Sequence, residues 1–470
     1  MSDLAVPAAD ALSPVHFIGI GGAGMSGIAR IMLARGLVVT GSDAKDSALL
    51  TALRAEGATV HVGHDPAHLA GARTVVANSA IRATNTELVA AHERGLQVLH
   101  RSQALAALAA GHRVVAVAGT NGKTTTTSML TVLLQHAGVD PSFSIGGELT
   151  ESGTNAHHGS GDAFVLEADE SDGTFVVYRP DIAIVTNVQP DHLDHYGDAA
   201  GVEAGFAAFA GSIRPGGRLI ACADDPGSAR LAGLAVSQGI AVDTYGETAG
   251  ADVRLSGLML STTGCSFTVT DRGRRLGAVR LRVPGHHNAL NAVAAVAAAV
   301  ALGTPPDVAL AGVGSFGGTR RRFEARGTAG GVRIFDDYAH NPGKVAAAIA
   351  TGRQVAGDGR LVAVFQPHLF SRTRDFAEAF GAALGGADEV VVMDVYAARE
   401  DPLPGVSGAL VARAVPLPAD RVAFVPSWSA VTDAVRARLR PGDVLLTIGA
   451  GDVTLLPDEV LARLGGGGRR

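Results

Sequence analysis

Residues 112–138 read HRVVAVAGTNGKTTTTSMLTVLLQHAG. An apolar run that ends at Ala118 leads into a short loop with two glycines, and the residues after Lys123 have the look of a helix. A strand, a glycine loop and a helix in this order form the repeating unit of an α/β sheet. The stretch therefore predicts an α/β unit that opens near residue 111.

The same alternation of strands and helices is found on both sides of this stretch. Before it, the expected strands are VHFIGI (15–20), LVVTGSD (37–43), RTVVANSAI (73–81) and LQVLH (96–100). After residue 316 they are VRIFDDY (332–338), RLVAVFQPH (360–368), EVVVMDVY (389–396), VAFVP (422–426) and DVLLTIGAG (443–451). Short strands between about 250 and 284 indicate a β-rich insertion in the middle unit, which a helix over 288–302 should close.

A length of 470 residues agrees with this division, since one hydrophobic core serves roughly 150 residues. We expect three domains, at residues 1–110, 111–316 and 317–470. The first and last should be Rossmann-like α/β units. The middle one should be an α/β unit of the P-loop ATPase type that carries the β-rich insertion.

Composition excludes several classes of protein. With 47% hydrophobic and 18% charged residues the chain is globular, and two cysteines are too few for a disulfide framework or a thiolate metal site. No apolar stretch is long enough to cross a membrane, and the first residues lack the features of a signal peptide, so we expect a cytoplasmic protein without membrane insertion. A net charge of −6 argues against a nucleic-acid partner.

Lysine is rare in this chain. Of 39 basic residues, three are lysines, at positions 45, 123 and 344. Lys123 falls in the glycine loop, where its ammonium and the backbone amides of Gly119, Thr120, Asn121 and Gly122 can surround nucleotide phosphates. Thr124 can reach Mg²⁺, and Thr125 follows it in the first turn. Val117 stands where the usual phosphate loop has its first glycine, so the loop is short, and a helix start capped by threonines is the alternative.

A second glycine motif opens the N-terminal unit. Gly19, Gly21 and Gly24 spell G-x-G-x-x-G between an expected strand and helix, and Asp43 ends the next strand, where a carboxylate often meets a ribose hydroxyl. NAD, FAD or a UDP-sugar would fit such a site. A tight turn that binds nothing is the alternative interpretation.

Two acidic segments follow strands of the middle unit. LEADESDGTF contains Glu167, Asp169, Glu170 and Asp172, and VTNVQPDHLDHYG contains Asp191 and His192. Because an open α/β sheet binds its ligands at the carboxyl ends of its strands, these groups suit Mg²⁺ beside a triphosphate. Apart from Glu167, we expect each carboxylate to be a solvated loop residue rather than a metal ligand.

Further polar side chains gather in three later segments. Asn288 and Asn291 lie at i and i+3 in PGHHNALNA, so their amides share a helix face and can read a purine edge, although helix capping by Asn288 is the alternative. FDDYAHNP and FQPHLFSRT carry the others at strand ends, and Arg372 among them suits a bidentate grip on a carboxylate or phosphate. A packed or surface-paired role is equally open for any one of them.

The order of these motifs resembles the Mur ligase family. The motifs are GIGGAGMSG, GTNGKTTTT, EADESD, TNVQPDHLDHYG, HNALNA, RRRF, DDYAHNP, QPHLFSRT, VYAAREDPLPGV and GAGDV, and they span nearly the whole chain. The resemblance implies a three-domain, ATP-dependent and Mg²⁺-dependent ligase that forms an acyl phosphate. Its implied substrates are UDP-N-acetylmuramic acid and L-alanine, joined in peptidoglycan precursor synthesis. It also implies a monomer or a weak homo-oligomer.

The resemblance assigns roles to individual residues. Lys123 would contact the phosphates, and Mg²⁺ would be bound by Thr124, Glu167 and His192. The rest of the nucleotide would lie among His287, Asn288, Asn291, Arg322 and Asp337. The amino acid and the activated carboxylate would face Tyr338, His340, His368 and Arg372. The UDP-sugar would be lined by Gly21, Ala23, Gly24, Ser42, Asp43 and Arg101. The catalytic residues would be Lys123, His192, His340 and Arg372.

Two departures from the family pattern qualify these roles. No lysine lies between Lys123 and Lys344, so the carbamylated lysine that bridges a second Mg²⁺ in some relatives is absent. Leu369 stands where other members have arginine. A ligase that recycles murein tripeptide is the alternative inside the family, and an NAD-dependent oxidoreductase or an ATP-driven switch is the alternative outside it.

Overall fold

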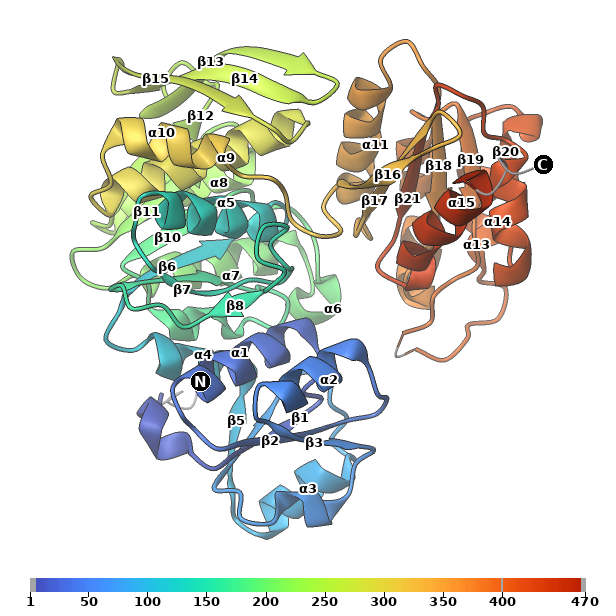
Figure 1. Ribbon diagram of the computed structural model, residues 1–470. Helices are drawn as coiled ribbons and strands as arrows, with labels where there is room; N and C mark the ends of the chain where they lie inside the picture. The colour runs from blue at the N-terminus through green and yellow to red at the C-terminus, as the bar shows by residue number, and fades with distance from the viewer. Residues whose placement is uncertain (1–5, 399, 466–470) are drawn as a thin grey trace. The chain divides into compact units, whose positions relative to one another are not determined.

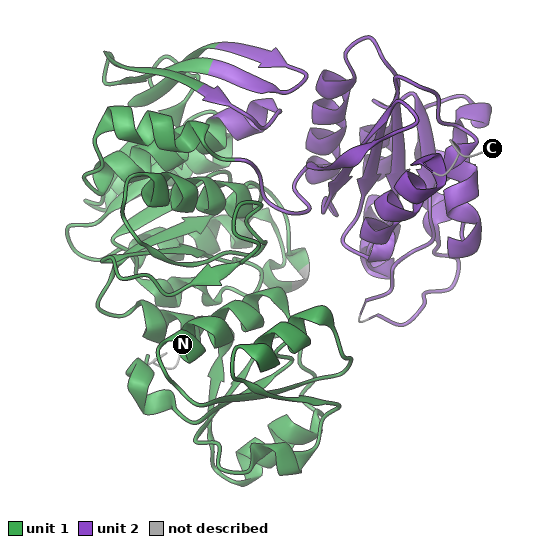
Figure 2. Cartoon of the chain, in the orientation of Figure 1, with its two compact units in different colours: residues 1–257, 267–279, 290–316 green, residues 258–266, 280–289, 317–470 purple. Residues whose placement is uncertain are grey.

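A computed structural model describes residues 6–398 and 400–465. The chain forms two compact units (Figure 2). The first comprises residues 1–257, 267–279 and 290–316, and the second comprises 258–266, 280–289 and 317–470. Three sheets with helices around them make up the units, which confirms the mixed α/β class.

The N-terminal sheet is parallel and has the strand order β3-β2-β1-β4-β5. Its strands are β1 (Val15–Ile18), β2 (Val39–Asp43), β3 (Thr59–Val62), β4 (Thr74–Ala77) and β5 (Gln97–His100). Its helices are α1 (Ala23–Ala34), α2 (Ala48–Ala55), α3 (Thr86–Glu93) and α4 (Arg101–Ala109), with single turns η1 (Ala9–Leu12) and η2 (Pro66–Leu69). Strand order reverses at β1, so a ligand is expected beyond its carboxyl end.

The second sheet has ten strands, in the order β15-β14-β13-β12-β11-β10-β6-β9-β7-β8. Its parallel centre consists of β6 (Arg113–Ala118), β9 (Ala163–Glu167), β10 (Ile182–Val185), β11 (Arg218–Cys222) and β12 (Ala241–Gly246). One edge is formed by β7 (Ser142–Ser144) and β8 (Ala156–His157), the other by β13 (Val253–Ser261), β14 (Gly264–Asp271) and β15 (Arg274–Leu281). The expected β-rich insertion is thus an extension of this sheet (Figure 1).

Two helices of this region lie where the sequence predicts them. The first, α5 (Lys123–His136), starts directly after the glycine loop, and α9 (His286–Ala301) covers the expected alanine-rich segment. The others are α6 (Leu193–Tyr196), α7 (Ala199–Gly211), α8 (Pro226–Ser237) and α10 (Pro306–Gly314), with the turn η3 (Thr174–Tyr178). In Figure 1, α1 and α4 lie between the N-terminal sheet and the ten-stranded sheet of the first unit.

The third sheet has the order β16-β17-β21-β18-β19-β20 and is parallel except for β16 against β17. Its strands are β16 (Glu324–Ala329), β17 (Val332–Asp337), β18 (Leu361–Phe365), β19 (Glu389–Val392), β20 (Val422–Phe424) and β21 (Val444–Ile448). Its helices and turns are α11 (Pro342–Ala356), α12 (Phe370–Leu384), α13 (Gly408–Ala414), η4 (Ala419–Arg421), α14 (Trp428–Arg436), η5 (Asp452–Leu455) and α15 (Leu456–Gly465).

Helices cover both faces of the third sheet. Leu361, Ala363 and Phe365 of β18 pack in one core with residues of α11, α12 and α13. Val362 and Val364 point the other way, into a core with α14 and α15. Because side chains alternate along a strand, an apolar run such as LVAVF marks a strand that is buried on both faces.

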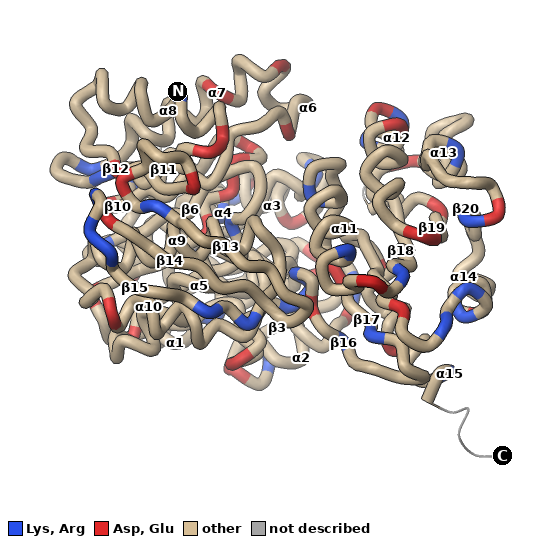
Figure 3. Tube along the Cα trace, turned by 90° about the horizontal axis from the view of Figure 1, so that it is seen from above, with Lys and Arg blue, Asp and Glu red and all other residues tan. Residues whose placement is uncertain are grey.

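Charged residues of both signs are spread along the described parts of the chain. Figure 3 shows acidic and basic positions interspersed in each unit, in keeping with the net charge of −6. Across the two described ranges, none of the helices combines the length and the apolar character needed to span a bilayer.

Candidate active site

The glycine loop between β6 and α5 needs both of its glycines. Gly119 has φ +135°, and a Cβ there would lie 2.0 Å from the Thr186 hydroxyl oxygen. Gly122 has φ +86° directly before α5, and its Cβ would lie 2.8 Å from Oδ1 of Asn291. The left-handed backbone and the close neighbours exclude side chains at both positions, while the N–H groups of Thr120 and Asn121 between them are bonded to Asn187.

Residues that follow β10 hold this loop in place. The backbone N–H of Asn121 donates to Oδ1 of Asn187 at 2.8 Å, and the Thr120 hydroxyl donates to the carbonyl of Gln189 at 3.1 Å. Thr125 lies in the first turn of α5 and is half-buried. The loop is therefore anchored to a neighbouring strand end rather than left mobile in solvent.

Lys123 forms a buried ion pair that the sequence did not indicate. Its Nζ lies 2.7 Å from Oε2 of Glu170 and donates to the carbonyl of Gly119 at 2.6 Å. The Lys123 side chain is 12% exposed and that of Glu170 is 3% exposed. The expectation that Glu170 is a solvated loop residue is therefore wrong, because its carboxylate is the counter-charge of the lysine in the glycine loop.

Burial acts on both partners of this pair. It opposes the charge on Lys123, but the carboxylates of Glu170, Asp169 and Glu167 outweigh it and raise the pKa of the ammonium. Burial also raises the pKa of the Glu170 carboxyl, against the pull of Lys123. The lysine is thus held charged and pointed at the loop, where a nucleotide phosphate could replace Glu170 as its partner.

Thr124 and Glu167 form a compact oxygen donor set beside Lys123. The Thr124 hydroxyl donates to Oε1 of Glu167 at 3.0 Å, and the Gly146 N–H donates to Oε2 at 2.7 Å. A Cβ on Gly146 would lie 2.7 Å from Oε2, so the loop approaches the carboxylate as closely as a glycine allows. A hydroxyl and a carboxylate suit Mg²⁺, which takes few protein ligands and keeps several waters.

The third expected metal ligand lies beside a different carboxylate. Nε2 of His192 is 3.9 Å from Oε1 of Glu170 and 4.0 Å from Oδ2 of Asp191. His192 itself has φ +53°, a left-handed backbone that is uncommon outside glycine. In residues 6–398 and 400–465, no group of three or more His, Cys, Asp or Glu side chains has the geometry of a metal cage. A magnesium ion here would depend on Thr124, Glu167 and waters first.

The glycine turn of the N-terminal sheet meets Asp43 as the motif predicts. The Gly21 N–H donates to Oδ2 of Asp43 at 2.9 Å, and a Cβ at Gly24 would lie 3.5 Å from Nη1 of Arg101. Ala23 begins α1, and its carbonyl accepts from the Asn155 amide at 2.7 Å. Five of the six residues expected around a UDP-sugar therefore converge on the turn after β1.

Ser42 differs from this group because its side chain is fully buried. Its hydroxyl donates to Oε2 of Glu87 at 2.5 Å, and its carbonyl accepts the N–H groups of Gly19 and Ile20. The structure thus gives Ser42 a supporting contact under the glycine turn.

Glu87 is the centre of a cluster that sequence reasoning missed. This carboxylate, on α3, is fully buried and accepts from His68 at 2.8 Å and from His64 at 3.1 Å, while His16 lies 3.7 Å away. Burial opposes its ionisation, but the donors around it outweigh burial and lower its pKa to about 2, from an ordinary value of 4.5. Its partners come from β1, β2 and the η2 segment, so no local motif could reveal them.

Replacing Glu87 with glutamine should make the free energy of unfolding less dependent on pH in the acidic range. Because the folded pKa lies near 2, the stability that the ionised group supplies is present above about pH 4.5 and is lost as pH falls toward 2. We expect Glu87→Gln to lower the free energy of unfolding by about 1–3 kcal/mol at pH 7. Urea unfolding between pH 7 and 3 measures it, and a constant gap between variant and unmodified chain over that range would contradict it.

Asn291 lies beside the glycine loop. His287 and Asn288, which were expected to bind the nucleotide with it, belong to the second unit. The Gly122 contact above brings Asn291 to the loop. The Asn288 amide, in the first turn of α9, donates to the carbonyl of Pro284 at 2.6 Å. Burial lowers the pKa of His287 to about 4. His287 lies beside α11, since a Cβ on Gly285 would contact both His287 and Thr351.

The second unit gathers aromatic and basic side chains at the carboxyl ends of β17 and β18. The ring centroids of Tyr338 and His340 are 5.3 Å apart, and those of His340 and His368 are 6.1 Å apart. Burial, with Lys344 and Arg372 adding to it, holds the pKa of His340 well below its usual value, so this imidazole is neutral. Arg372 lies in the first turn of α12, half-buried.

Asp337 and Arg322 frame the same sheet edge. Both carboxylate oxygens of Asp337 accept backbone N–H groups, from Phe323 at 2.7 Å and Ala339 at 2.8 Å. Burial nevertheless raises its pKa to about 6, against Arg322. The guanidinium carbon of Arg322 lies 5.3 Å from the centre of the Tyr338 ring, and that of Arg321 lies 4.6 Å from it.

Two neighbours in this unit were not among the expected site residues. Tyr396 stacks on His368 with ring centroids 5.9 Å apart and is 37% exposed. Leu369 is buried and enters α12 with φ +71°. The missing arginine at this position is thus replaced by an apolar side chain that packs inward.

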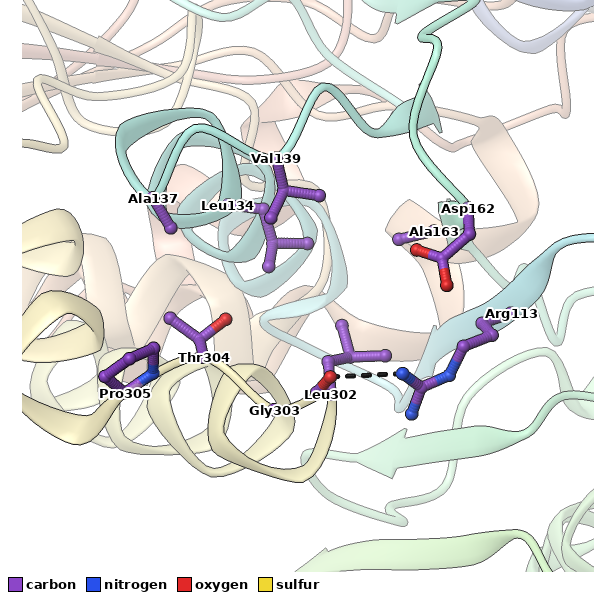
Figure 4. Close-up of a pocket in the computed structure, with 10 residues that line it drawn as sticks. All are labelled: Arg113, Leu134, Ala137, Val139, Asp162, Ala163, Leu302, Gly303, Thr304 and Pro305. Atoms are coloured by element: carbon purple, nitrogen blue, oxygen red, sulfur yellow. Dashed lines mark hydrogen bonds between the residues drawn. The ribbon is translucent and has the colours of Figure 1, made fainter.

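A separate cavity of about 200 Å³ lies at the amino-terminal ends of β6 and β9 in the ten-stranded sheet. It is lined by Arg113, Leu134, Ala137, Val139, Asp162, Ala163, Leu302, Gly303, Thr304 and Pro305 (Figure 4). Arg113 begins β6, whereas the glycine loop follows the last residue of that strand, and its guanidinium donates to the carbonyl of Leu302 at 3.1 Å. The cavity is therefore distinct from the glycine loop between β6 and α5.

Three family profiles match successive parts of the chain. The description "Mur ligase family, catalytic domain" fits residues 14–113, "Mur ligase middle domain" fits 117–299, and "Mur ligase, glutamate ligase domain" fits 321–451. A curated protein of Kineococcus radiotolerans, named UDP-N-acetylmuramate–L-alanine ligase, is 58% identical over 96% of each chain. This chain belongs to the Mur ligase family.

Solved structures of Mur ligases agree with this fold. A UDP-N-acetylmuramate-alanine ligase from Thermotoga maritima has a TM-score of 0.82 at 27% identity and covers 96% of this chain and 98% of its own. A murein peptide ligase from Psychrobacter arcticus has a TM-score of 0.72 at 25% identity, with coverage of 96% and 98%. The Mur ligase assignment confirms the expected family and three-domain fold, and it does not favour the oxidoreductase alternative.

Proposed function

We propose that the chain joins L-alanine to the lactyl carboxylate of UDP-N-acetylmuramic acid, with ATP as the energy source, in peptidoglycan precursor synthesis. The observation that carries this proposal is the 58% identity, over nearly the whole of both chains, to a protein named for that reaction. The lysine-bearing glycine loop supports the role of ATP, because its geometry suits phosphates.

The chemistry requires an activated carboxylate. A carboxylate resists attack by an amine, so the γ-phosphoryl group of ATP is first transferred to the lactyl carboxylate oxygen, with release of ADP. The amine of L-alanine then attacks the carbonyl carbon of the acyl phosphate, and the C–O bond to phosphate breaks. In this scheme Lys123 leaves Glu170 to neutralise charge on the transferring phosphoryl group.

Mg²⁺ would neutralise further charge on the phosphates when bound. Thr124, Glu167 and His192 would bind it. Around the nucleotide we propose Gly119, Thr120, Asn121, Gly122, Thr125 and Asn291 from the first unit. From the second unit we propose His287, Asn288, Arg322 and Asp337.

The substrates would occupy the two remaining clusters. We propose that Gly21, Ala23, Gly24, Asp43 and Arg101 bind the UDP-sugar, and that Ser42 supports the glycine turn beneath them. Tyr338, His340, His368 and Arg372 would face the amino acid and the activated carboxylate, where Arg372 can grip a carboxylate with two hydrogen bonds. The neutral His340 can accept or donate a proton at its ring nitrogen.

The remaining expectations stay predictions. We propose domains at residues 1–110, 111–316 and 317–470, a monomer or weak homo-oligomer, a cytoplasmic location, and no nucleic-acid partner. The profile limits at 113, 117 and 321 are consistent with those domain borders.

Phosphate release from ATP and Mg²⁺ tests the proposed function. The assay contains UDP-N-acetylmuramic acid with L-alanine, with glycine, with the murein tripeptide, or with no amine. We expect release that requires both the UDP-sugar and L-alanine. Dependence on the tripeptide would instead assign the chain to the recycling branch, and release that ignores the UDP-sugar would contradict the ligase activity.

A further inference from the structure

The segment after β9 contacts two regions of the first unit with alternate carboxylates. Glu167 and Glu170 face the phosphate loop, through Thr124 and Lys123. Asp169 and Asp172 face the N-terminal region instead. Oδ2 of Asp169 accepts from Arg101 at 2.6 Å, and Oδ2 of Asp172 accepts from the Ser79 hydroxyl at 2.5 Å.

The N-terminal partners of this segment lie beside the glycine turn. Arg101 begins α4, and its guanidinium is the closest neighbour of Gly24, at 3.5 Å from a Cβ built there. His100, the residue before it, places Nε2 3.2 Å from Oδ2 of Asp172. The Arg101 and Asp169 side chains are 17% and 37% exposed, and those of His100 and Asp172 are 20% and 14% exposed, so these contacts are partly shielded from solvent.

One short path of contacts therefore joins the two glycine motifs. It runs from Gly24 through Arg101 to Asp169, and along one peptide bond to Glu170, which holds Lys123. The backbone of the segment is itself braced, because the Tyr196 hydroxyl donates to the Glu170 carbonyl at 2.5 Å. Because these contacts are direct, a displacement of the backbone at one glycine motif changes the contacts at the other.

We propose that Asp169 and Asp172 are positioning residues that couple the UDP-sugar site to the phosphate loop, through the Arg101–Asp169 and Ser79–Asp172 contacts. This inference rests on the proposed function, because it assumes a UDP-sugar at the first motif and ATP at the second. An anionic diphosphate near Gly24 competes with Asp169 for Arg101. Release of Asp169 frees the segment that keeps Glu170 on Lys123, so each ligand alters the affinity of the other.

Binding of a non-hydrolysable ATP analogue measures this coupling without turnover. Its Kd is determined by calorimetry with Mg²⁺, in the absence and presence of saturating UDP-N-acetylmuramic acid. For the unmodified chain we expect the two values to differ by about fivefold or more, in the usual range of coupling between sites. In Asp169→Asn, which keeps the size of the side chain, the ratio should fall close to one.

A matched control separates coupling from loss of structure. Arg30→Gln removes a 3.0 Å hydrogen bond to Asn155 that joins the same two regions but leaves the acidic segment intact, so its ratio should equal that of the unmodified chain. If Asp169→Asn unfolds, Ser79→Ala at an exposed position removes one contact of Asp172 and should lower the ratio in part. Loss of local structure alone would raise the Kd by the same factor with and without the UDP-sugar, and it would leave the ratio unchanged.

Three results would overturn the inference. One is a ratio of one in the unmodified chain, and another is an unchanged ratio in both the Asp169→Asn and Ser79→Ala variants. Failure of UDP-N-acetylmuramic acid to bind at all would contradict the proposed function itself and the coupling with it. Binding of the sugar without an effect on the analogue contradicts the coupling and leaves the proposed function standing.

Discussion

A Lys123→Ala variant should lose ATP-driven turnover and still bind UDP-N-acetylmuramic acid. The ammonium is the cation of the phosphate loop, and removal of one such stabilising group costs about 10²–10³-fold in kcat. The UDP-sugar motif has its own amides and its own carboxylate, Asp43, so its affinity should change little. Phosphate release and calorimetry with the UDP-sugar measure the two effects separately, and an active variant would contradict the assigned loop.

The same substitution should also destabilise the fold. Without the lysine, Glu170 keeps a buried carboxyl with no counter-charge, and breaking a buried pair in this way costs about 3–5 kcal/mol. The double variant Lys123→Ala/Glu170→Gln should recover most of that stability, because a neutral amide needs no cation beside it. It should recover none of the turnover, because the lysine is still absent. Urea unfolding of both variants tests this, and equal stabilities would show that the pair contributes little.

Glu167→Gln should raise the concentration of Mg²⁺ that supports half-maximal turnover. The amide keeps the size of the side chain but replaces one of the two carboxylate oxygens with an NH2 group. Its single oxygen cannot accept from both Thr124 and Gly146 and also bind a cation. Changes to groups around a metal typically cost 10–100-fold in affinity, and we expect a loss of at least about that size. A magnesium titration of phosphate release at saturating ATP measures it.

Glu203→Gln provides the control for that titration. Glu203 is an exposed carboxylate on α7 of the same unit, paired with Arg230 at 2.5 Å. Exposed ion pairs contribute little, so its magnesium dependence should match that of the unmodified chain. If Glu167→Gln behaves like this control, the carboxylate beside Thr124 has no part in binding the metal.

The parts of the fold that carry strong local patterns could be predicted from sequence. The run RVVAVA and the glycine loop predict β6 and the start of α5, because burial on both faces requires an unbroken apolar strand. The strand β3 was not predicted. Its four residues, TVHV, form an edge strand with exposed residues at both ends, so it lacks the unbroken apolar run that marks the buried strands.

The candidate site divides in a similar way. Gly21, Asp43, Lys123 and Thr124 lie where the motifs place them, because strand–loop–helix geometry is local. Sequence could not tell which carboxylate of EADESD faces Lys123, since that depends on the turn the segment takes after β9. The surroundings of Glu87 come from separate segments and have no linear signature at all.

The pairing of Lys123 with Glu170 also gives this chain a built-in chemical reporter. Acylating reagents react with neutral, accessible amines, and the chain offers them three lysine side chains. Lys45 lies exposed, whereas Lys123 is enclosed and its pKa is raised. The ratio of label at these two positions, read by mass spectrometry of peptides after the folded protein is labelled, thus reports how often the pair opens. No fluorophore, engineered cysteine or radioactive nucleotide is needed to follow this loop.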